Sequence, residues 1–576
     1  MSRDQEKDPA GFEKFEEFLQ AWSRRDFIRR MGATAAWAAF TTGGLELLEA
    51  CGGSSTSTSV TPKKGGHVTL GRSSTADIKT FNPVLSGDDG SSLVSTLCFD
   101  SLLTIDAKGQ PAPLLAESFG VASDGLTYTF HLHKNAKWTD GQPVTADDVV
   151  FTYQLMYDPK YKKVSSPRRG TLEKYIESVT ATDANTVVIK TKSVFAPFLV
   201  QHSGYGIVPK HVLGTLDAAA INTADFNSGP TVTSGAFKFV KWEKGQQVTF
   251  ARNDNYYLGA PYLDQFILKL VSGGSVAIGN QLKTGEIDLG PIDPSAFDDF
   301  RTVTSVTVGE YPTASFEFYA YNQDPSKPAG KFFADKSVRQ ALLYALDRDK
   351  VAKAVYFGHA TTAVTPIPPV LWAFNGSTQP NYKFDKAKAE SLLDAAGWAK
   401  GSDGIRSKGG TRFKIELITN AGNKVRENLI QVMSQQWRDI GVDCTPKPID
   451  FGALVDQIVH TRTFDVFLVG FGPFTDPDQS SIFHSRNSVD GGFDGFGFSN
   501  PEVDKLLDDG VATVDRAKRL DIYKQYQAKM NDLVPAPPIV FANALPGVSK
   551  RVQGTRYSTF VGFGQFAKDV WVTDGK

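Results

Sequence analysis

The chain has 576 residues, which predicts about three or four compact units, because single domains usually run to ~100–200 residues. Hydrophobic residues make up 41% and charged residues 22%, an ordinary balance for a globular protein. The net charge of −1 argues against a nucleic-acid partner, and three cysteines exclude a disulfide scaffold or a CxxC metal domain. We expect a multidomain globular protein.

The N-terminal segment has the pattern of an export signal. Arg24 and Arg25 begin the run RRDFI, which is typical of a twin-arginine signal, and a small-residue apolar run follows at residues 31–48. Glycine, alanine and Glu46 make this run a poor permanent membrane span. A buried helix with a chance arginine pair is the alternative. We expect residues 1–50 to be a signal peptide that exports the chain.

A lipid-attachment pattern closes this signal. Cys51 follows Leu-Glu-Ala, which resembles a lipobox, although Glu49 is unusual at its position. The next residues read GGSSTSTS, the composition of a flexible tether. We expect residues 51–64 to be a lipid-anchored tether that holds the body at the outer face of the cell membrane or in the periplasm.

The other two cysteines, Cys98 and Cys444, allow a disulfide in an exported protein. Proteins exported by the twin-arginine route fold first in a reducing compartment. We therefore prefer two buried free thiols.

Strands and helices alternate along the body. Residues 127–133 alternate apolar and polar side chains, as a half-buried strand does, and residues 186–190 form a second short strand. Thr145, followed by acidic residues, predicts a helix start, and Ser337 predicts another. Three further helices are predicted at 387–396 (ending at Gly397), 425–440 (ending at Gly441) and 516–533. With no internal repeat, this pattern predicts an α/β protein with more than one sheet.

Thirteen short motifs then occur in a distinctive order. They are Phe81-Asn82-Pro83, Phe99-Asp100-Ser101-Leu102-Leu103, Leu115-Ala116-Glu117-Ser118-Phe119, Asp124-Gly125-Leu126-Thr127-Tyr128-Thr129-Phe130, Trp138-Thr139-Asp140-Gly141, Thr145-Ala146-Asp147-Asp148-Val149-Val150-Phe151, Ser234-Gly235-Ala236-Phe237, Arg252-Asn253 with Tyr256-Tyr257, Val338-Arg339-Gln340-Ala341-Leu342, Pro368-Pro369, Lys386-Ala387-Lys388, Ala396-Gly397-Trp398 and Asp476-Pro477-Asp478. Together they resemble the peptide/nickel class (family 5) of extracellular solute-binding proteins of ABC importers, over nearly all of residues 65–576.

The resemblance implies a periplasmic-binding-protein-like, two-lobe (venus-flytrap) α/β fold with an extra domain inserted in the first lobe. The implied lobe 1 comprises residues 65–104, 227–320 and 543–576, the inserted domain 105–226, and lobe 2 residues 321–542. It also implies a ligand held in the interlobe cleft and a hinge that closes on it.

The implied function is capture of a small solute, by default a peptide, and its delivery to ABC permease subunits with their cytoplasmic ATPase. Two alternatives are a signalling or adhesion receptor that reuses the fold and a cell-wall hydrolase. The chain lacks HExxH, GxSxG and P-loop motifs, which argues against an enzyme. His131 and His133 share a strand face but do not complete a zinc site, so we expect no metal and no cofactor.

By the resemblance, two segments contact the ligand. The first contains Ser86, Gly87, Asp88 and Asp89, whose glycine permits close backbone approach and whose carboxylates suit an amine. The alternative is a solvated turn that caps the next helix through Ser91.

The second segment spans residues 470–478. Peptide binders of this class carry an amine-binding Asp where this chain has Pro473, so binding of a free peptide amine is in question. Phe471, Phe474 and Trp372 are predicted to form apolar walls, with a plain core role as the alternative. Asp476 is predicted at the site or as a turn cap.

Overall fold

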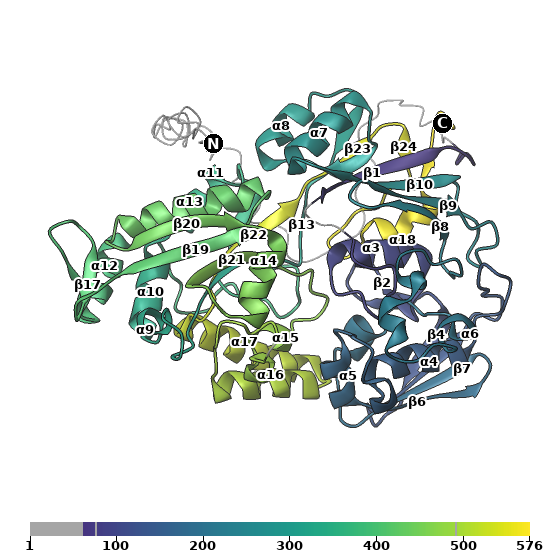
Figure 1. Ribbon diagram of the computed structural model, residues 1–576, viewed down its shortest axis with the longest axis horizontal. Helices are drawn as coiled ribbons and strands as arrows, with labels where there is room; N and C mark the ends of the chain where they lie inside the picture. Colours follow the sequence, from purple (N-terminus) through teal and green to yellow (C-terminus); the bar gives the residue numbers. More distant parts are fainter. Residues whose placement is uncertain (1–60, 75–77, 490–491) are drawn as a thin grey trace, which may run out of the picture. The chain divides into compact units, whose positions relative to one another are not determined.

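The computed structural model describes residues 61–74, 78–489 and 492–576. Arg24, Arg25 and Cys51, which carry the export and lipid predictions, lie outside these residues. No helix in the described part of the chain is long and apolar enough to cross a membrane. The fold is mixed α/β with several sheets, as predicted (Figure 1).

The first large sheet gathers strands from distant parts of the chain. Its order is β12 (Val306–Val308), β23 (Pro546–Ser549), β11 (Leu289–Pro291), β1 (His67–Ser73), β10 (Gln265–Val271), β9 (Gln247–Arg252) and β8 (Phe237–Glu243). β1 runs parallel to β10, with Val68 opposite Phe266. Both of these side chains are fully buried, so this sheet organises one core.

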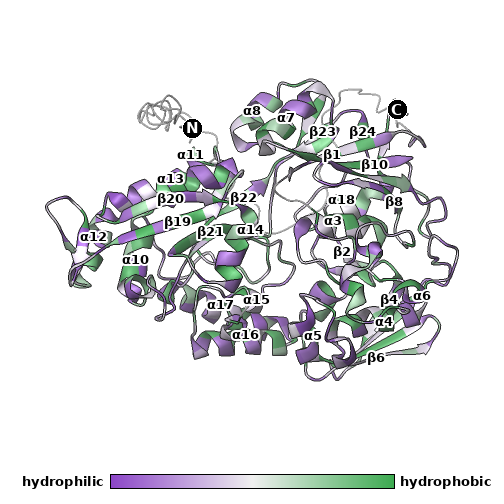
Figure 2. Ribbon diagram, viewed as in Figure 1, coloured by the Kyte–Doolittle hydropathy of each residue, from purple (hydrophilic) through white to green (hydrophobic). Residues whose placement is uncertain are grey.

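The second large sheet is built from the later half of the chain. Its order is β13 (Tyr311–Pro312), β22 (Pro538–Ala544), β14 (Phe316–Tyr321), β21 (Val466–Phe471), β19 (Lys414–Asn420) and β20 (Asp443–Ile449), with β15 (Ala360–Thr362) also on β22. The parallel strands β19 and β20 are joined by helix α13 (Lys424–Arg438), as such strands require. Figure 2 shows polar and apolar stretches along α13, whose apolar face buries Trp437.

The chain passes between these two sheets twice. It goes from β12 to β13 through residues 309–310, and from β22 to β23 at Leu545. The two crossing segments are antiparallel neighbours, because β12 pairs with β23 and β13 pairs with β22. All of β14 pairs within the second sheet, whereas we expected lobe 1 to continue to residue 320. Nothing in the apolar pattern marks the residue at which a strand leaves one sheet for another.

A four-stranded sheet lies in the region expected to be inserted. It has the order β4 (Ala116–Val121), β5 (Thr127–Leu132), β7 (Thr186–Thr191) and β6 (Ile176–Asp183), and helix α4 (Ala146–Tyr157) contacts β6 and β7. The predicted strand and helix start are confirmed, since Phe130 is buried in β5 and Thr145 forms a capping box with Asp148.

The other predicted helices are α12 (Lys386–Ala395), α13 and α17 (Arg516–Leu533). Gly397 and Gly441 follow α12 and α13 with φ of +84° and +92°, which glycine adopts without steric cost. The predicted Ser337 cap is wrong. Asp335 caps α10 (Lys336–Tyr344), accepting a hydrogen bond from the Ser337 N–H at 2.8 Å, because the helix begins one residue before the serine.

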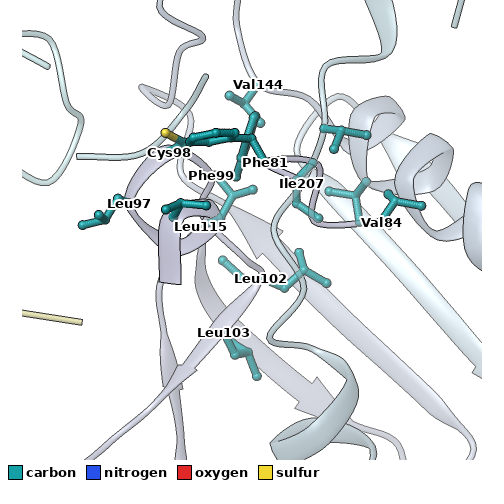
Figure 3. Packing of buried hydrophobic residues seen from close by; sticks show 14 of the residues in the cluster. Phe81, Val84, Leu97, Cys98, Phe99, Leu102, Leu103, Leu115, Val144 and Ile207 are labelled. Atoms are coloured by element: carbon teal, nitrogen blue, oxygen red, sulfur yellow. The ribbon is translucent and has the colours of Figure 1, made fainter. Parts of the chain in front are cut away.

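One core cluster fixes the first predicted ligand segment. Side chains before and after residues 85–91 pack with side chains of the inserted region, including Phe81, Val84, Leu97, Phe99, Leu115, Val144 and Ile207 (Figure 3). Cys98 lies in this cluster and Cys444 in another; both are buried free thiols, as preferred. Burial raises the pKa of each thiol, so neither is a reactive thiolate at neutral pH.

Candidate ligand-binding site

The first predicted ligand segment ends at the start of helix α3 (Asp89–Cys98). Asp88 caps this helix by accepting a hydrogen bond from the Ser91 N–H at 2.8 Å, and Asp89 forms an ion pair with Arg72. Both carboxylates predicted to receive an amine therefore have partners within the chain. Ser86 is buried, and Gly87 is exposed.

The second predicted segment begins at the end of β21. The rings of Phe471 and Phe474 lie 5.8 Å apart, and Phe474 stacks on Phe316 at 5.7 Å. Phe471 is half-buried and also contacts Phe493, whose side chain is 48% exposed. Phe471 and Phe474 thus lie in one group of contacting aromatic rings.

A cavity of ≈ 180 Å³ lies beside Phe471. It is lined by Thr313, Ser315, Phe316, Glu317, Arg426, Gly470, Phe471, Gly472 and Ala542. Its charged members are paired: Arg426 Nε and Nη2 donate to the two Glu317 oxygens at 2.9 and 3.1 Å. Burial lowers the pKa of Arg426, but the Glu317 carboxylate outweighs burial and leaves this pKa above its usual value.

Sequence reasoning missed this ion pair. The two residues are 109 positions apart, and neither belongs to a motif. One available signal was an acid, Glu317, within the otherwise apolar and aromatic strand FEFYAY.

Asp476 and Trp372 both contact residues of helix α17. Asp476 is 4% exposed and accepts two hydrogen bonds from Arg519, at 2.9 and 2.6 Å. The Arg519 guanidinium lies 5.4 Å from the centre of the Trp372 ring, and Trp372 also contacts Tyr523. The structure thus joins Asp476 and Trp372 to helix α17, and Trp372, Phe471 and Phe474 all pack in one hydrophobic cluster.

Contacts also join the inserted region to the second lobe. The Thr475 hydroxyl donates to the Val200 carbonyl at 3.1 Å, and the Ala196 N–H donates to the Val511 carbonyl at 2.8 Å. Lys174, in α5 (Arg169–Tyr175), pairs with Asp508, in α16 (Pro501–Ala512), at 3.2 Å. The second ligand segment is therefore bound directly to the inserted region through Thr475.

The first ligand segment reaches the same region through Arg168, which sequence reasoning also missed. Arg168 Nη1 donates to the Ser86 carbonyl at 2.7 Å. Each of the two predicted segments is thus hydrogen-bonded to the inserted region, the first at Arg168 and the second at Val200. In the sequence, Arg168 is distinguished only by its position next to a second arginine, Arg169.

Metal-binding geometry is absent from residues 61–74, 78–489 and 492–576, where no group of three or more His, Cys, Asp or Glu side chains is placed to hold an ion. His131 instead contacts the Thr186 hydroxyl, and His133 lies 3.6 Å from Glu117.

Comparison with known proteins agrees with this architecture. Residues 110–493 match the family model described as bacterial extracellular solute-binding proteins, family 5 middle. The oligopeptide-binding protein AppA of Bacillus subtilis is 31% identical over 520 residues, covering 88% of this chain and 93% of AppA.

Solved structures give the same result. The structure of Bacillus subtilis AppA in complex with a nonapeptide has a TM-score of 0.81 at 29% identity, covering 89% of this chain and 100% of that one. NikZ of Campylobacter jejuni in complex with Ni(L-His) has a TM-score of 0.78 at 27% identity, covering 88% and 99%. The sequence match and the shared fold lead to one conclusion: this chain belongs to the family 5 bacterial extracellular solute-binding proteins.

Proposed function

We propose that the protein captures a short peptide or a peptide-like solute between its two lobes and delivers it to an ABC permease. Family 5 proteins are the non-catalytic substrate-binding components of ABC importers, and this chain is one of them. The observation that carries the peptide proposal is the nonapeptide complex of AppA, a relative aligned with 89% of this chain.

We further propose that Gly87, Phe471 and Phe474 contact the ligand directly, and that Ser86, buried and bonded to Arg168 through its carbonyl, holds this segment in place. Asp88, Asp89, Asp476 and Trp372 are proposed to support the site, since their polar or aromatic groups already have partners within the chain. An apolar wall with a few polar groups is the usual composition of such a site.

Uptake in a deletion strain tests this function. The strain, made auxotrophic for one amino acid, should lose growth on peptides that contain it and keep growth on the free amino acid. Wild-type protein should restore growth, and Phe471→Ala should restore it less well. Equal growth of the deletion strain on peptides would contradict the proposal.

Export by the twin-arginine route and lipid attachment at Cys51 complete the proposal; they rest on the order of Arg24-Arg25, the apolar run and the cysteine. Cys51→Ala should release the protein from the membrane fraction, because a diacylglyceryl group binds membranes at ~0.8 kcal/mol per buried CH₂. Arg24→Lys with Arg25→Lys should leave precursor in the cytoplasm. Unchanged fractionation of either variant would contradict the corresponding step.

A further inference from the structure

Arg168 is a half-buried arginine without a carboxylate partner among the residues that the structure describes. Its Nη1 donates to the Ser86 carbonyl at 2.7 Å, and its guanidinium lies 4.4 Å from the centre of the Tyr205 ring. A guanidinium has five N–H donors and favours planar, two-point binding of carboxylates. The Tyr205 hydroxyl forms a second hydrogen bond with Arg168, and the remaining N–H groups of Arg168 have no partner among the described residues.

Other shielded arginines of the chain are used differently. Arg426 and Arg519 each hold a carboxylate by two hydrogen bonds. Arg339 and Arg348 each donate to three backbone carbonyls: those of Phe333, Ala334 and Leu533 for the first, and of Ala363, Pro538 and Tyr382 for the second. These four have evident structural roles, and Arg168 lacks the contacts that define them.

The titratable groups around Arg168 do not neutralise it. Burial, followed by the charge of Arg168, lowers the pKa of His202 to about 3, so this histidine is neutral at pH 7. Burial raises the pKa of Tyr205 to about 12 and that of Tyr153 above its usual value. A guanidinium stays protonated at neutral pH. Arg168 thus carries an uncompensated positive charge.

Arg168 lies where the two proposed ligand segments meet the inserted region. Pro167 is 3.3 Å from the position that a Cβ on Gly87 would occupy, so residues 167–168 touch the first segment. Tyr205, under the guanidinium, bonds to His202, and Val200 nearby accepts the hydrogen bond from Thr475 of the second segment. Pro473 in that segment brings no charge, and Asp88 and Asp89 are already paired.

We infer that Arg168 binds a carboxylate of the ligand, so that the solute is anchored by its anionic group and not by a free amine. The inference rests on the proposed function and names its substrate class: peptides or peptide-like solutes with a free carboxylate, whose amine is either blocked or left in solvent. Lys160, Lys162 and Lys163, exposed in the same segment as Arg168, favour the approach of such an anion.

Affinity selection with mass spectrometry tests this on the full chain. The probes are pools of random tri- to hexapeptides without Asp or Glu in four forms: free, N-acetylated, C-amidated, and blocked at both ends. We expect retention of the free and N-acetylated pools, and about 10–100-fold weaker retention of both amidated pools. A fifth pool, amidated but with one Asp or Glu, distinguishes a side-chain carboxylate from the C-terminal one as the anchored group; its retention also supports the inference.

Variants assign the effect to Arg168. Arg168→Gln should lower retention of the carboxylate pools about 10–100-fold and leave the amidated pools unchanged. Lys137→Gln removes an exposed positive charge elsewhere in the inserted region and should have little effect. Arg168→Lys, which keeps the charge but loses the planar fork, should be intermediate, and melting temperatures report whether each variant is folded.

Equal retention of amidated and carboxylate pools by the wild-type chain would overturn the inference and leave the proposed function intact. Equal retention of the carboxylate pools by folded Arg168→Gln or Arg168→Lys would do the same. No retention of any pool would contradict the proposed peptide function, and the inference with it.

Discussion

At the scale of single residues, motifs predict local contacts better than long-range partners. Asp476 was predicted at the site or as a turn cap, and the turn cap is confirmed, since its carboxylate accepts a hydrogen bond from the Asp478 N–H at 3.0 Å. The same carboxylate is held by Arg519, 43 residues away, and sequence spacing does not reveal this partner, because α17 reaches Asp476 only through the tertiary fold. In the first segment, the predicted cap is on the wrong residue: Asp88, not Ser91, caps α3.

The ion pair makes a stability prediction. Asp476→Ala leaves the Arg519 charge, whose side chain is 8% exposed, without its carboxylate partner, which should cost roughly 3–5 kcal/mol of unfolding free energy. Urea unfolding measures this loss. Asp89→Ala removes an 81% exposed carboxylate and should cost less than about 1 kcal/mol. Equal stability of the two variants would contradict the supporting role of Asp476.

Asp100 makes a prediction about pH. Burial raises its pKa to about 7, and the Tyr257 and Tyr256 hydroxyls offset this only in part. The unfolded carboxyl titrates near ~3.9, so between about pH 4 and 7 the native state keeps a proton that the unfolded state releases. The contribution of Asp100 to stability therefore falls as pH rises through this window and levels off above about pH 7.

Asp100→Asn should flatten this dependence. From pH 5 to pH 8, the unfolding free energy of Asp100→Asn should fall less than that of wild type. Urea unfolding at both pH values measures this difference. Asp89→Asn, at an exposed site, serves as the control. Parallel pH profiles for wild type and Asp100→Asn would show that the native carboxyl titrates in its ordinary range.

At the scale of elements, strong local patterns predicted the structure well. Helix α17 has the predicted bounds, and the strand at residues 127–133 is found almost unchanged. The crossings at residues 309–310 and 545 depend on long-range strand pairing, which local patterns do not carry. The same holds at the cavity: the predicted aromatic residues stand close together in the sequence, whereas Glu317 in β14 and Arg426 in α13 are brought together only by the fold.

Gly470 links β21 to this pair and provides the next prediction. A Cβ at this position would lie 2.3 Å from Arg426 Nη2 and 2.8 Å from Glu317 Oε1, so Gly470→Ala should displace the pair. We expect a loss of roughly 1–3 kcal/mol in unfolding free energy and weaker peptide retention. Gly120→Ala, in β4 with open space around the added methyl, is the matched control. A stability equal to that of the control would show that the pair moves without cost.

At the scale of the whole molecule, two kinds of connection join the lobes. The crossing segments at 309–310 and 545 are covalent and short, as hinges of binding proteins are. The contacts of Thr475, Val511 and Asp508 with the inserted region are not covalent and can separate. We therefore expect closure of the two lobes to depend on these weak contacts, and a ligand between the lobes to add to them.

Lys174→Glu tests these contacts. It places a second negative charge against Asp508 in a pair whose side chains are 42% and 47% exposed, so the effect should be at most about 1 kcal/mol and should shrink in high salt. The radius of gyration from small-angle scattering should increase at low salt. Lys190→Glu disrupts a similarly exposed pair with Glu177 inside the four-stranded sheet and should not change the radius. An equal radius for both variants would contradict the closing role of the Lys174–Asp508 contact.

Capture of a small solute is the central claim, and native mass spectrometry tests it most directly. The chain purified from its own host should carry a non-covalent mass, lose it on unfolding and refolding, and regain a similar adduct from the free-carboxylate peptide pool. Rebinding should also raise the melting temperature, since ligand at 100-fold over Kd adds about 2.7 kcal/mol of stability. A refolded chain that takes up no peptide from the pool and shows no change in melting temperature would contradict the account.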